Sequence, residues 1–333
     1  MIPDIQSIIL KSLNAEKAVY KEKIQTLWSG YGEIARYQVF NGDKPSVILK
    51  HVKLPEEKNH PRGWNTDISH QRKIKSYQVE SNWYQEFAEL CDDNCRVPKC
   101  YAVEKSETEF LILLEDLDFA GYPVRLQSVS IADMKVCLKW LANFHSRFLT
   151  KDDNDKQASR LWQIGTYWHL DTRPDELDAL DDLTLKNAAR EIDDRLNQCE
   201  FKTLVHGDAK LANFCFSEDS HSVAAVDFQY VGVGCGMKDI AYFIGSCLYE
   251  EDCERFEQEL LNYYFTELKQ AVANNNSGFE FSKLEKEWRE MYPFAWADFH
   301  RFLKGWSPGH WKINSYSEKL TKRVIKMLKE KDL

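Results

Sequence analysis

The sequence has 333 residues, 43% of them hydrophobic, which is too long for one small core and suits two lobes or domains. Its net charge of -9 and pI near 5.6 argue against a nucleic-acid-binding surface, because such a surface is basic. The first residues lack the pattern of a signal peptide, and no apolar run approaches the roughly 18 residues of a membrane span. We therefore expect a cytoplasmic protein with no nucleic-acid and no membrane partner.

The nine cysteines do not predict a metal site. Cys91, Cys95 and Cys100 cluster, but they have no Cys-x-x-Cys spacing and no His-x-x-x-His pair follows, so structural zinc is not expected. Most of the others lie in apolar runs, where cysteine behaves as a small buried hydrophobic residue. Reduced thiols fit a cytoplasmic enzyme.

The first part of the chain predicts a short helix followed by three antiparallel strands. Residues 4–13 have helical apolar spacing. Three segments read as strands joined by turns: residues 23–30, 33–40 and 46–52. Gly30 and Gly32 lie in the first turn, where glycine lets the backbone approach a phosphate closely. A simple hairpin is the alternative reading of this turn.

Lys50 lies on the third strand, which is otherwise apolar. A lysine in such a strand either extends along the sheet edge with its ammonium in water or points inward at an anion. His51 and Lys53 are the alternatives if the strand is shifted, and Lys53 would lie on the opposite face from Lys50.

A loop over residues 54–66 and a long helix over residues 68–90 follow. Glu80 lies on the side of this helix that carries its aromatic residues, and an acid on an inward face needs a partner. We expect that partner to be Lys50. Glu86 is the alternative acid for the same pair, and an ordinary exposed glutamate is the remaining reading of position 80.

Two more strands and two helices are expected before the polar motif described next. Residues 97–103 and 110–114 read as the fourth and fifth strands, after which the sequence turns abruptly polar. Residues 131–149 predict a helix with a continuous apolar side, and residues 174–198 predict a charged, mostly exposed helix.

The chemistry is concentrated in residues 204–229, where short apolar runs alternate with His, Asp, Lys and Asn. Asp208, Lys210 and Asn213 fall on one loop, and Asp227 follows after one hairpin. Two carboxylates and an amide oxygen can converge on Mg²⁺, which prefers hard oxygen ligands. Phosphoryl transfer uses the same groups: a carboxylate that accepts the hydroxyl proton, an amide and an acid that hold metal, and a lysine that offsets charge.

These loops carry a resemblance to a known superfamily. His-Gly-Asp at 206–208, Asn213 five residues after the Asp, and Asp-Phe at 227–228 resemble the catalytic and metal-binding loops of the protein-kinase-like fold. The His-Gly-Asp form is similar to the small-molecule branch: aminoglycoside phosphotransferases, choline kinases and the ecdysteroid kinase-like family.

The resemblance implies a role for each residue of the motif. Asp208 would be the catalytic base, Asn213 and Asp227 the Mg²⁺ ligands, and His206 a scaffold residue packed behind the loop. Lys210 departs from the small-molecule branch, which often has an aromatic residue or His at this position, and it reads as a contact to the γ-phosphate.

The resemblance also extends to the first part of the chain. Lys50 would bind the α- and β-phosphates of ATP and pair with Glu80, while the two glycines of the first turn would cover the phosphates. Glu115 and Leu117, in the segment that resembles the connection between lobes, would bind adenine through backbone groups.

The acceptor is expected to be a small molecule because Asp239 follows Asp227 by only twelve residues. A protein kinase needs a long activation segment in this interval to hold a peptide, and the interval has no room for one. Asp239 itself resembles the buried aspartate that binds the backbone of the catalytic loop.

An aromatic concentration near the end of the chain suggests an acceptor pocket. Core packing is the default for many of these residues, but residues 305–311 read as a loop, so we expect a pocket near Trp296, Trp306 and Trp311. Such a wall with a carboxylate would suit an amine through cation–π attraction, and without charge it would suit a flat apolar alcohol.

Together these observations predict an α+β, two-lobe, protein-kinase-like fold. Residues 1–115 would form a nucleotide-binding lobe of about five antiparallel strands plus a long helix, and residues 116–333 a mainly helical catalytic and substrate-binding lobe. The predicted activity is ATP- and Mg²⁺-dependent phosphorylation of a small-molecule alcohol. The alternative is a catalytically weak nucleotide-binding pseudokinase that acts as an interaction module.

Overall fold

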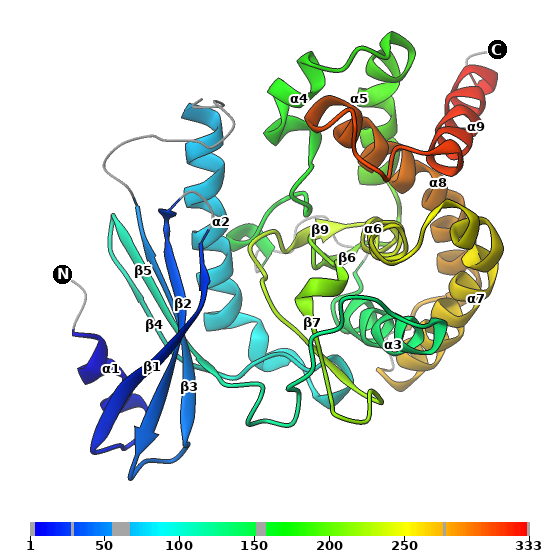
Figure 1. The fold of residues 1–333 in the computed structure, drawn as a ribbon. Coiled ribbons are helices and arrows are strands. Elements are labelled where there is room, and N and C mark those ends of the chain that lie inside the picture. Colours follow the sequence, from blue (N-terminus) through cyan, green and yellow to red (C-terminus); the bar gives the residue numbers. More distant parts are fainter. Residues whose placement is uncertain (1–3, 28–29, 55–66, 151–157, 276–277, 332–333) are drawn as a thin grey trace.

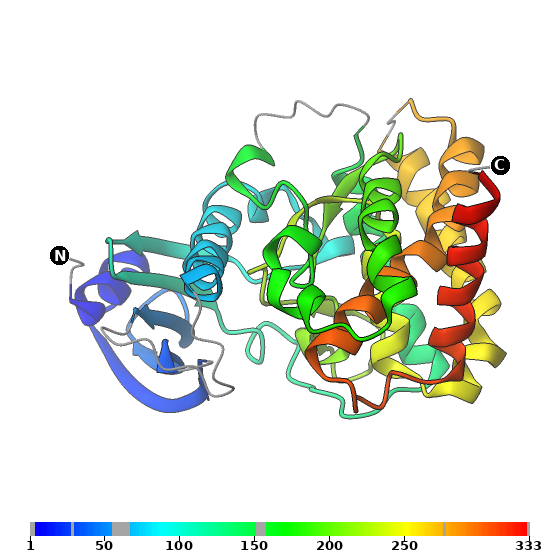
Figure 2. The same ribbon diagram turned by 90° about the horizontal axis from the view of Figure 1, so that it is seen from above.

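The computed structural model describes residues 4–27, 30–54, 67–150, 158–275 and 278–331. The chain forms a small lobe built on one β-sheet and a larger, mainly helical lobe (Figure 1). Helix α2 lies between the sheet and the helical lobe, so it can contact both (Figure 2).

The small lobe contains a five-stranded antiparallel sheet in the order β1-β2-β3-β5-β4. Its elements are α1 (Ile5–Ser12), β1 (Lys17–Thr26), β2 (Gly32–Phe40), β3 (Ser46–Lys53), α2 (Asp67–Glu86), β4 (Cys100–Lys105) and β5 (Glu109–Glu115). The predicted α+β fold, with about five antiparallel strands and a long helix, is confirmed. The prediction placed the first strand at residues 23–30. In the structure the strand already begins at Lys17, which lies opposite Phe40 in the sheet.

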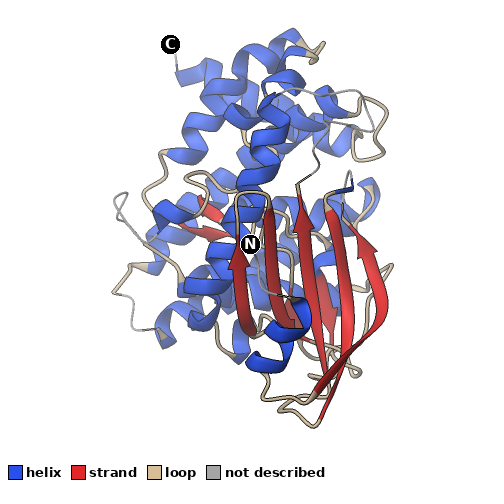
Figure 3. Cartoon of the chain, turned by 90° about the vertical axis from the view of Figure 1, so that its left-hand side faces the viewer, coloured by secondary structure: helices blue, strands red, loops and turns tan. Residues whose placement is uncertain are grey.

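The two faces of β3 have different neighbours, as the period-two alternation of a strand requires. Leu49 packs with Ile9 of α1, which lies in front of the sheet in Figure 3. Val52 faces the other way and packs with Tyr77 of α2. Lys50 shares the direction of Val52, so its side chain lies between the sheet and α2.

Aromatic stacking joins α2 to the larger lobe. Trp83 stacks on Phe228 with 4.4 Å between ring centroids and an interplanar angle of 13°. The same Trp packs against Phe144 at 5.8 Å. Offset and tilted ring pairs of this kind contribute about 0.5–1.5 kcal/mol each beyond their buried area. Phe228, the neighbour of Asp227, is therefore held by a helix of the small lobe.

The larger lobe combines two short strand pairs, β6 with β9 and β7 with β8, with most of the helices. Its strands are Thr203–Val205 (β6), Phe214–Phe216 (β7), Val223–Ala225 (β8) and Gly232–Gly234 (β9). Its helices are Ile131–Arg147 (α3), Pro174–Asp178 (α4), Leu183–Asn197 (α5), Met237–Cys247 (α6), Glu250–Asn274 (α7), Phe281–Trp306 (α8) and Ser315–Lys331 (α9). Single 3₁₀ turns cover Ala88–Leu90, Asp93–Cys95, Ala158–Arg160, Leu170–Thr172 and Leu211–Asn213.

The prediction of one exposed helix over residues 174–198 is wrong. The segment forms two helices, and Asp182 caps the second by accepting from the backbone N–H of Leu185 at 3.1 Å. Ile192 and Leu196 are buried, so α5 packs against the lobe with one face. Because charged residues are frequent throughout this segment, its sequence pattern showed neither the break between α4 and α5 nor the apolar face of α5.

The loop predicted at residues 54–66 lies outside the described residues, apart from Leu54. All nine cysteines are free thiols. Across the ranges that the structure describes, no helix is both long and apolar enough to cross a membrane.

Candidate active site

The loop after β6 is held by a buried carboxylate from the start of α6. Asp239 accepts from the backbone N–H of His206 at 2.6 Å and from that of Gly207 at 3.0 Å. Its Oδ2 also lies 3.1 Å from Nε2 of His145, whose Nδ1 contacts Tyr264 at 2.8 Å. Hydrogen bonds to a charged group contribute about 1.5–3 kcal/mol each, so these contacts fix the loop backbone.

Gly207 is required by the path of this loop. Its φ is +79°, and a Cβ at this position would lie 2.1 Å from the carbonyl oxygen of Tyr230. Any other residue would be strained and would overlap that backbone atom. The sharp turn at Gly207 directs the next side chain, Asp208, away from the core.

His206 lies behind the loop, where the resemblance places a scaffold residue. Its side chain is fully buried, and its ring centroid lies 4.6 Å from that of Phe228. Nδ1 accepts from the backbone N–H of Asp208 at 3.3 Å, and Nε2 contacts the carbonyl oxygen of Val226 at 3.0 Å. This pattern corresponds to a ring with its proton on Nε2, which ties the two loops together.

Three side chains donate hydrogen bonds to the Asp208 carboxylate. Lys210 Nζ lies 2.8 Å and Asn213 Nδ2 3.2 Å from Oδ2, and the hydroxyl of Tyr242 lies 3.1 Å from Oδ1. Burial alone would lower the pKa of Lys210, but Asp208 outweighs this effect and raises it. Lys210 is therefore a charged neighbour of Asp208.

Asp227 follows β8 in a left-handed backbone conformation, with φ +70°. Its Oδ1 accepts from Gln229 Nε2 at 2.7 Å and from Lys50 Nζ at 3.3 Å. Burial by itself would raise the pKa of Asp227, but Lys50, Lys210 and Lys73 lower it to about 2. Asp227 therefore carries its negative charge at neutral pH.

The contacts of Lys50 show that its acidic partner is Glu80 and not Glu86. Lys50 Nζ lies 2.7 Å from the nearer oxygen of Glu80, and both side chains are buried. Burial alone would lower the pKa of Lys50, yet Glu80 and Asp227 raise it. Glu86 instead pairs with Arg160 on the surface.

The two shifted alternatives to Lys50 lie on the opposite face of β3. His51 and Lys53 both contact Glu109, and the Lys53 side chain is mostly exposed. Position 50 is the one in this strand from which a cation contacts Glu80 and Asp227.

The donor set beside Asp208 fits Mg²⁺. The amide nitrogen of Asn213 donates to Asp208. Its carbonyl oxygen has no partner among the described residues and could therefore be a metal ligand. Asp227 likewise uses Oδ1 for Lys50 and Gln229 and leaves Oδ2 without a partner in the described part of the chain. One carboxylate oxygen and one amide oxygen match the sparse protein ligation that Mg²⁺ takes beside phosphates.

The other predicted nucleotide contacts lie at the ends of strands. Gly30 is exposed in the turn between β1 and β2, whereas Gly32 starts β2, where a Cβ would lie 2.0 Å from the carbonyl oxygen of His51. Glu115 ends β5, and its side chain is already bonded to Arg96 and to the backbone N–H of Lys99. Its backbone N–H donates to the carbonyl oxygen of Lys99 at 2.8 Å, so a ligand contact of Glu115 would have to use its own carbonyl oxygen.

Leu117 is buried after β5 and packs with Cys215 and Ala224 of the larger lobe. Its carbonyl oxygen accepts from the backbone N–H of Tyr122 at 2.8 Å. As for Glu115, any ligand contact of Leu117 would have to use the backbone.

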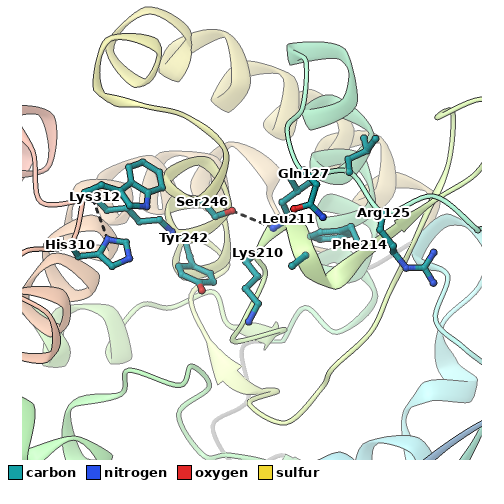
Figure 4. A pocket seen from close by; sticks show the side chains of 12 residues that line it. Arg125, Gln127, Lys210, Leu211, Phe214, Tyr242, Ser246, His310 and Lys312 are labelled. Atoms are coloured by element: carbon teal, nitrogen blue, oxygen red, sulfur yellow. Dashed lines mark hydrogen bonds between the residues drawn. The ribbon is translucent and has the colours of Figure 1, made fainter. Parts of the chain in front are cut away.

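A cavity of about 390 Å³ opens beside the catalytic loop (Figure 4). It is lined by Lys210 and Leu211 of that loop, Tyr242 of α6 and Trp311 and Lys312 of the segment between α8 and α9. Lys210 and Tyr242 both contact Asp208, so two of the lining residues join the cavity to the predicted base, which does not itself line it.

The expected aromatic wall is only partly present at this cavity. Trp311 lines it, but Trp296 is buried against Tyr316, and Trp306 stacks on Phe302 at 5.7 Å. Placing Trp306 in a loop was wrong, since α8 continues to that residue and the loop begins at Ser307.

Sequence reasoning missed two residues that contact the site. Gln229 bridges Asp227 to α2 by accepting from Lys73 Nζ at 3.1 Å, and Tyr242 contacts Asp208. Two signals could have found them: Gln229 directly follows the Asp-Phe pair, and Tyr242 lies three residues after Asp239, on the same side of α6.

Comparisons with known proteins show which family the chain resembles over most of its length. Residues 41–160 and 157–277 match the model of the Ecdysteroid kinase-like family, and these segments together span more than half of the chain. A search of curated proteins gave no match.

The chain is also similar to solved structures at low sequence identity. An ethanolamine kinase of Plasmodium vivax is 14% identical over 97% of this chain and 83% of that chain, with a TM-score of 0.51. An aminoglycoside-3'-phosphotransferase of type VIII is 16% identical over 83% and 95%, with a TM-score of 0.48. An aminoglycoside phosphotransferase from Streptomyces rimosus is 12% identical over 81% and 92%, with a TM-score of 0.45. The family match and the similarity to the ethanolamine kinase confirm the predicted two-lobe kinase-like fold.

Proposed function

Because the chain belongs to the ecdysteroid kinase-like family, we propose that it is a phosphotransferase that uses ATP and Mg²⁺ to phosphorylate a hydroxyl group of a small molecule. The observation that supports this best is the meeting of Lys50, Glu80 and Asp227 between the lobes, next to the loop that presents Asp208. Residues far apart in the sequence would not gather cations, carboxylates and free oxygens here for core packing alone, because buried charges are costly.

In this proposal Asp208 is the base. The acceptor hydroxyl gives its proton to the carboxylate as its oxygen bonds to the γ-phosphorus, and the bond from that phosphorus to the oxygen it shares with the β-phosphate breaks to release ADP. Tyr242 and Asn213 orient the carboxylate through their hydrogen bonds to it. Lys210, on the same carboxylate, would offset charge on the moving phosphoryl group.

The nucleotide would lie against the residues that face the lobe junction. Lys50, oriented by Glu80, would bind the α- and β-phosphates, and the turn with Gly30 and Gly32 would cover them. Asn213 and Asp227 would hold Mg²⁺, which when bound supplies charge neutralisation for the phosphate oxygens. His206 supports the loop from behind and touches no substrate.

We further propose that residues 1–115 form the nucleotide-binding lobe and residues 116–333 the catalytic and acceptor-binding lobe. Two observations support this boundary: β5 ends at Glu115, and Leu117 already packs with residues of β7 and β8. Backbone groups of Glu115 and Leu117 would then bind adenine where the lobes meet.

The experiment that tests the function has two steps. Mg-ATP binding is measured by calorimetry with and without the metal, and ADP release is then followed against a panel of amino alcohols, sugars, aminoglycosides, steroid alcohols and hydroxy acids. We expect metal-dependent binding and at least one acceptor that accelerates ADP release. Binding without turnover for every acceptor would contradict the proposed reaction.

A further inference from the structure

The cavity beside the catalytic loop is cationic. Its lining includes Arg125, Lys210 and Lys312, and no acidic residue is among the described residues that line it. His310 also lines the cavity, and it brings no negative charge. Burial lowers the pKa of its imidazole, which disfavours the charged form of the ring. The described lining therefore offers no carboxylate to pair with the ammonium group of a choline-like or aminoglycoside-like acceptor.

Two of the three cations already have an acidic partner. Arg125 pairs with Asp118 at 2.9 Å, and in Figure 4 its guanidinium points away from the other labelled side chains. Lys210 pairs with Asp208 at 2.8 Å. Neither cation therefore needs a ligand to be compensated.

Lys312 differs from both. Within the parts of the chain that the structure describes, its ammonium has no carboxylate within ion-pair distance; it lies over the rings of Tyr242 at 5.1 Å, Trp311 at 5.5 Å and Phe299 at 5.6 Å. Burial lowers its pKa to about 8, while Cys247 and the Asp208 carboxylate act in the opposite direction. Apart from these rings, an anionic group of a ligand could supply the carboxylate partner that this partly buried ammonium lacks among the described residues.

The segment that carries Lys312 is ordered by its own hydrogen bonds. The backbone N–H of Lys312 donates to His310 Nδ1 at 3.2 Å, and the Ser317 hydroxyl donates to the Lys312 carbonyl oxygen at 3.1 Å. These bonds hold the backbone of Lys312 in place at the wall of the cavity that it lines.

Resting on the proposed function, we propose that the phosphate acceptor carries a carboxylate-type anionic group, which Lys312 binds while Tyr242 and Trp311 pack against the acceptor's apolar body. The reacting hydroxyl lies at the other end of the molecule, toward Asp208. The cavity volume of about 390 Å³ is within the range of small-molecule sites. The acceptor class is thus hydroxy acids, in preference to amino alcohols.

The test uses three probes that differ in one group: para-hydroxymethylbenzoate, its uncharged amide, and para-aminomethylbenzyl alcohol as the cation. Calorimetry of the full chain measures their dissociation constants in the wild type and in K312Q, K312R and K319Q. Lys319 is the matched control, because it is an exposed lysine paired with Glu254 away from the cavity.

The wild type should bind the benzoate about tenfold or more tighter than the amide, as expected for a charge-assisted hydrogen bond. K312Q should lose this preference, K312R should keep most of it, and K319Q should match the wild type. Equal or absent binding of the three probes, preference for the cation, or a preference that survives in K312Q would overturn the proposal.

Competition separates the acceptor from the nucleotide. A non-hydrolysable ATP analogue should leave benzoate binding in place; if it displaced the probe, Lys312 would belong to the nucleotide site and the acceptor assignment would fail. ADP release by the wild type with any acceptor, and its loss in D208N, tests the proposed function independently of these probes.

Discussion

Replacing Glu80 with Gln removes one negative charge from a buried cluster without changing its volume. Lys50 lies 2.7 Å from Glu80 and 3.3 Å from Asp227, so the substitution leaves the ammonium buried with a single carboxylate. Breaking a buried ion pair typically costs 3–5 kcal/mol, and because Asp227 remains we expect a loss near the lower end, about 3 kcal/mol. Lys50 should then turn fully to Asp227 and weaken Mg-ATP binding by about tenfold or more.

Glu86→Gln is the matched control for this prediction. Glu86 is on the same helix and pairs with Arg160, but that pair is exposed and should contribute less than about 1 kcal/mol. Urea unfolding of both variants gives the two losses in unfolding free energy, and calorimetry gives the affinity for Mg-ATP. Equal losses in the two variants, or a neutral Glu80→Gln, would refute the argument that burial makes the Glu80 pair important.

Three further predictions follow from the loops. Since its lysine neighbours lower the pKa of Asp227 to about 2 from 3.8, its ionised form stabilises the fold above about pH 4, and this stability is lost as the pH falls toward 2. After allowance for partial exposure this amounts to about 1–2 kcal/mol, so the stability gap between wild type and D227N in urea should shrink from about pH 7 to about pH 3. G207A should lose about 3 kcal/mol or more in urea unfolding because its Cβ would overlap Tyr230, whereas G309A, with open space around it, should stay within about 0.5 kcal/mol. D239N should lower kcat by about tenfold or more while the KM for ATP changes little, because it loosens the backbone before Asp208; an unchanged kcat would show that the loop holds its shape without this carboxylate.

The fold could be predicted from local patterns where one face of an element is buried. The apolar run over residues 46–52 predicted the strand β3, but it left open whether Lys50 points inward or lies along the sheet edge, because both faces of β3 are largely buried. The segment over residues 174–198 failed, because its charges are spread over both helices and the break at Asp182 depends on a side-chain cap. Capping competes with helix continuation over only a few residues and is difficult to distinguish in a charged segment.

The candidate site could be predicted only as far as its sequence motif extends. Asp208, Asn213 and Asp227 lie on two loops joined by one hairpin, so their proximity is nearly local. The contact between Lys50 and Asp227 is not local, since 177 positions separate the two residues. It depends on how the lobes pack.

The cavity beside the loop that carries Asp208 was the least predictable part of the site. Its lining comes from the segment before α3, the catalytic loop, α6 and the segment after α8, and no local pattern relates them. Of the three tryptophans predicted to form an aromatic wall, only Trp311 lines the cavity, whereas Trp296 and Trp306 pack against other aromatic residues.

The central claim is that Asp208 accepts a proton during phosphoryl transfer, and D208N tests it most directly. With the best acceptor from the panel, or with water as the acceptor, ADP release should fall by about 10²–10⁴-fold, while Mg-ATP binding stays within about threefold of the wild type. D252N, a change at an exposed position in the first turn of α7, should behave as the wild type. Full activity in D208N would contradict the claim.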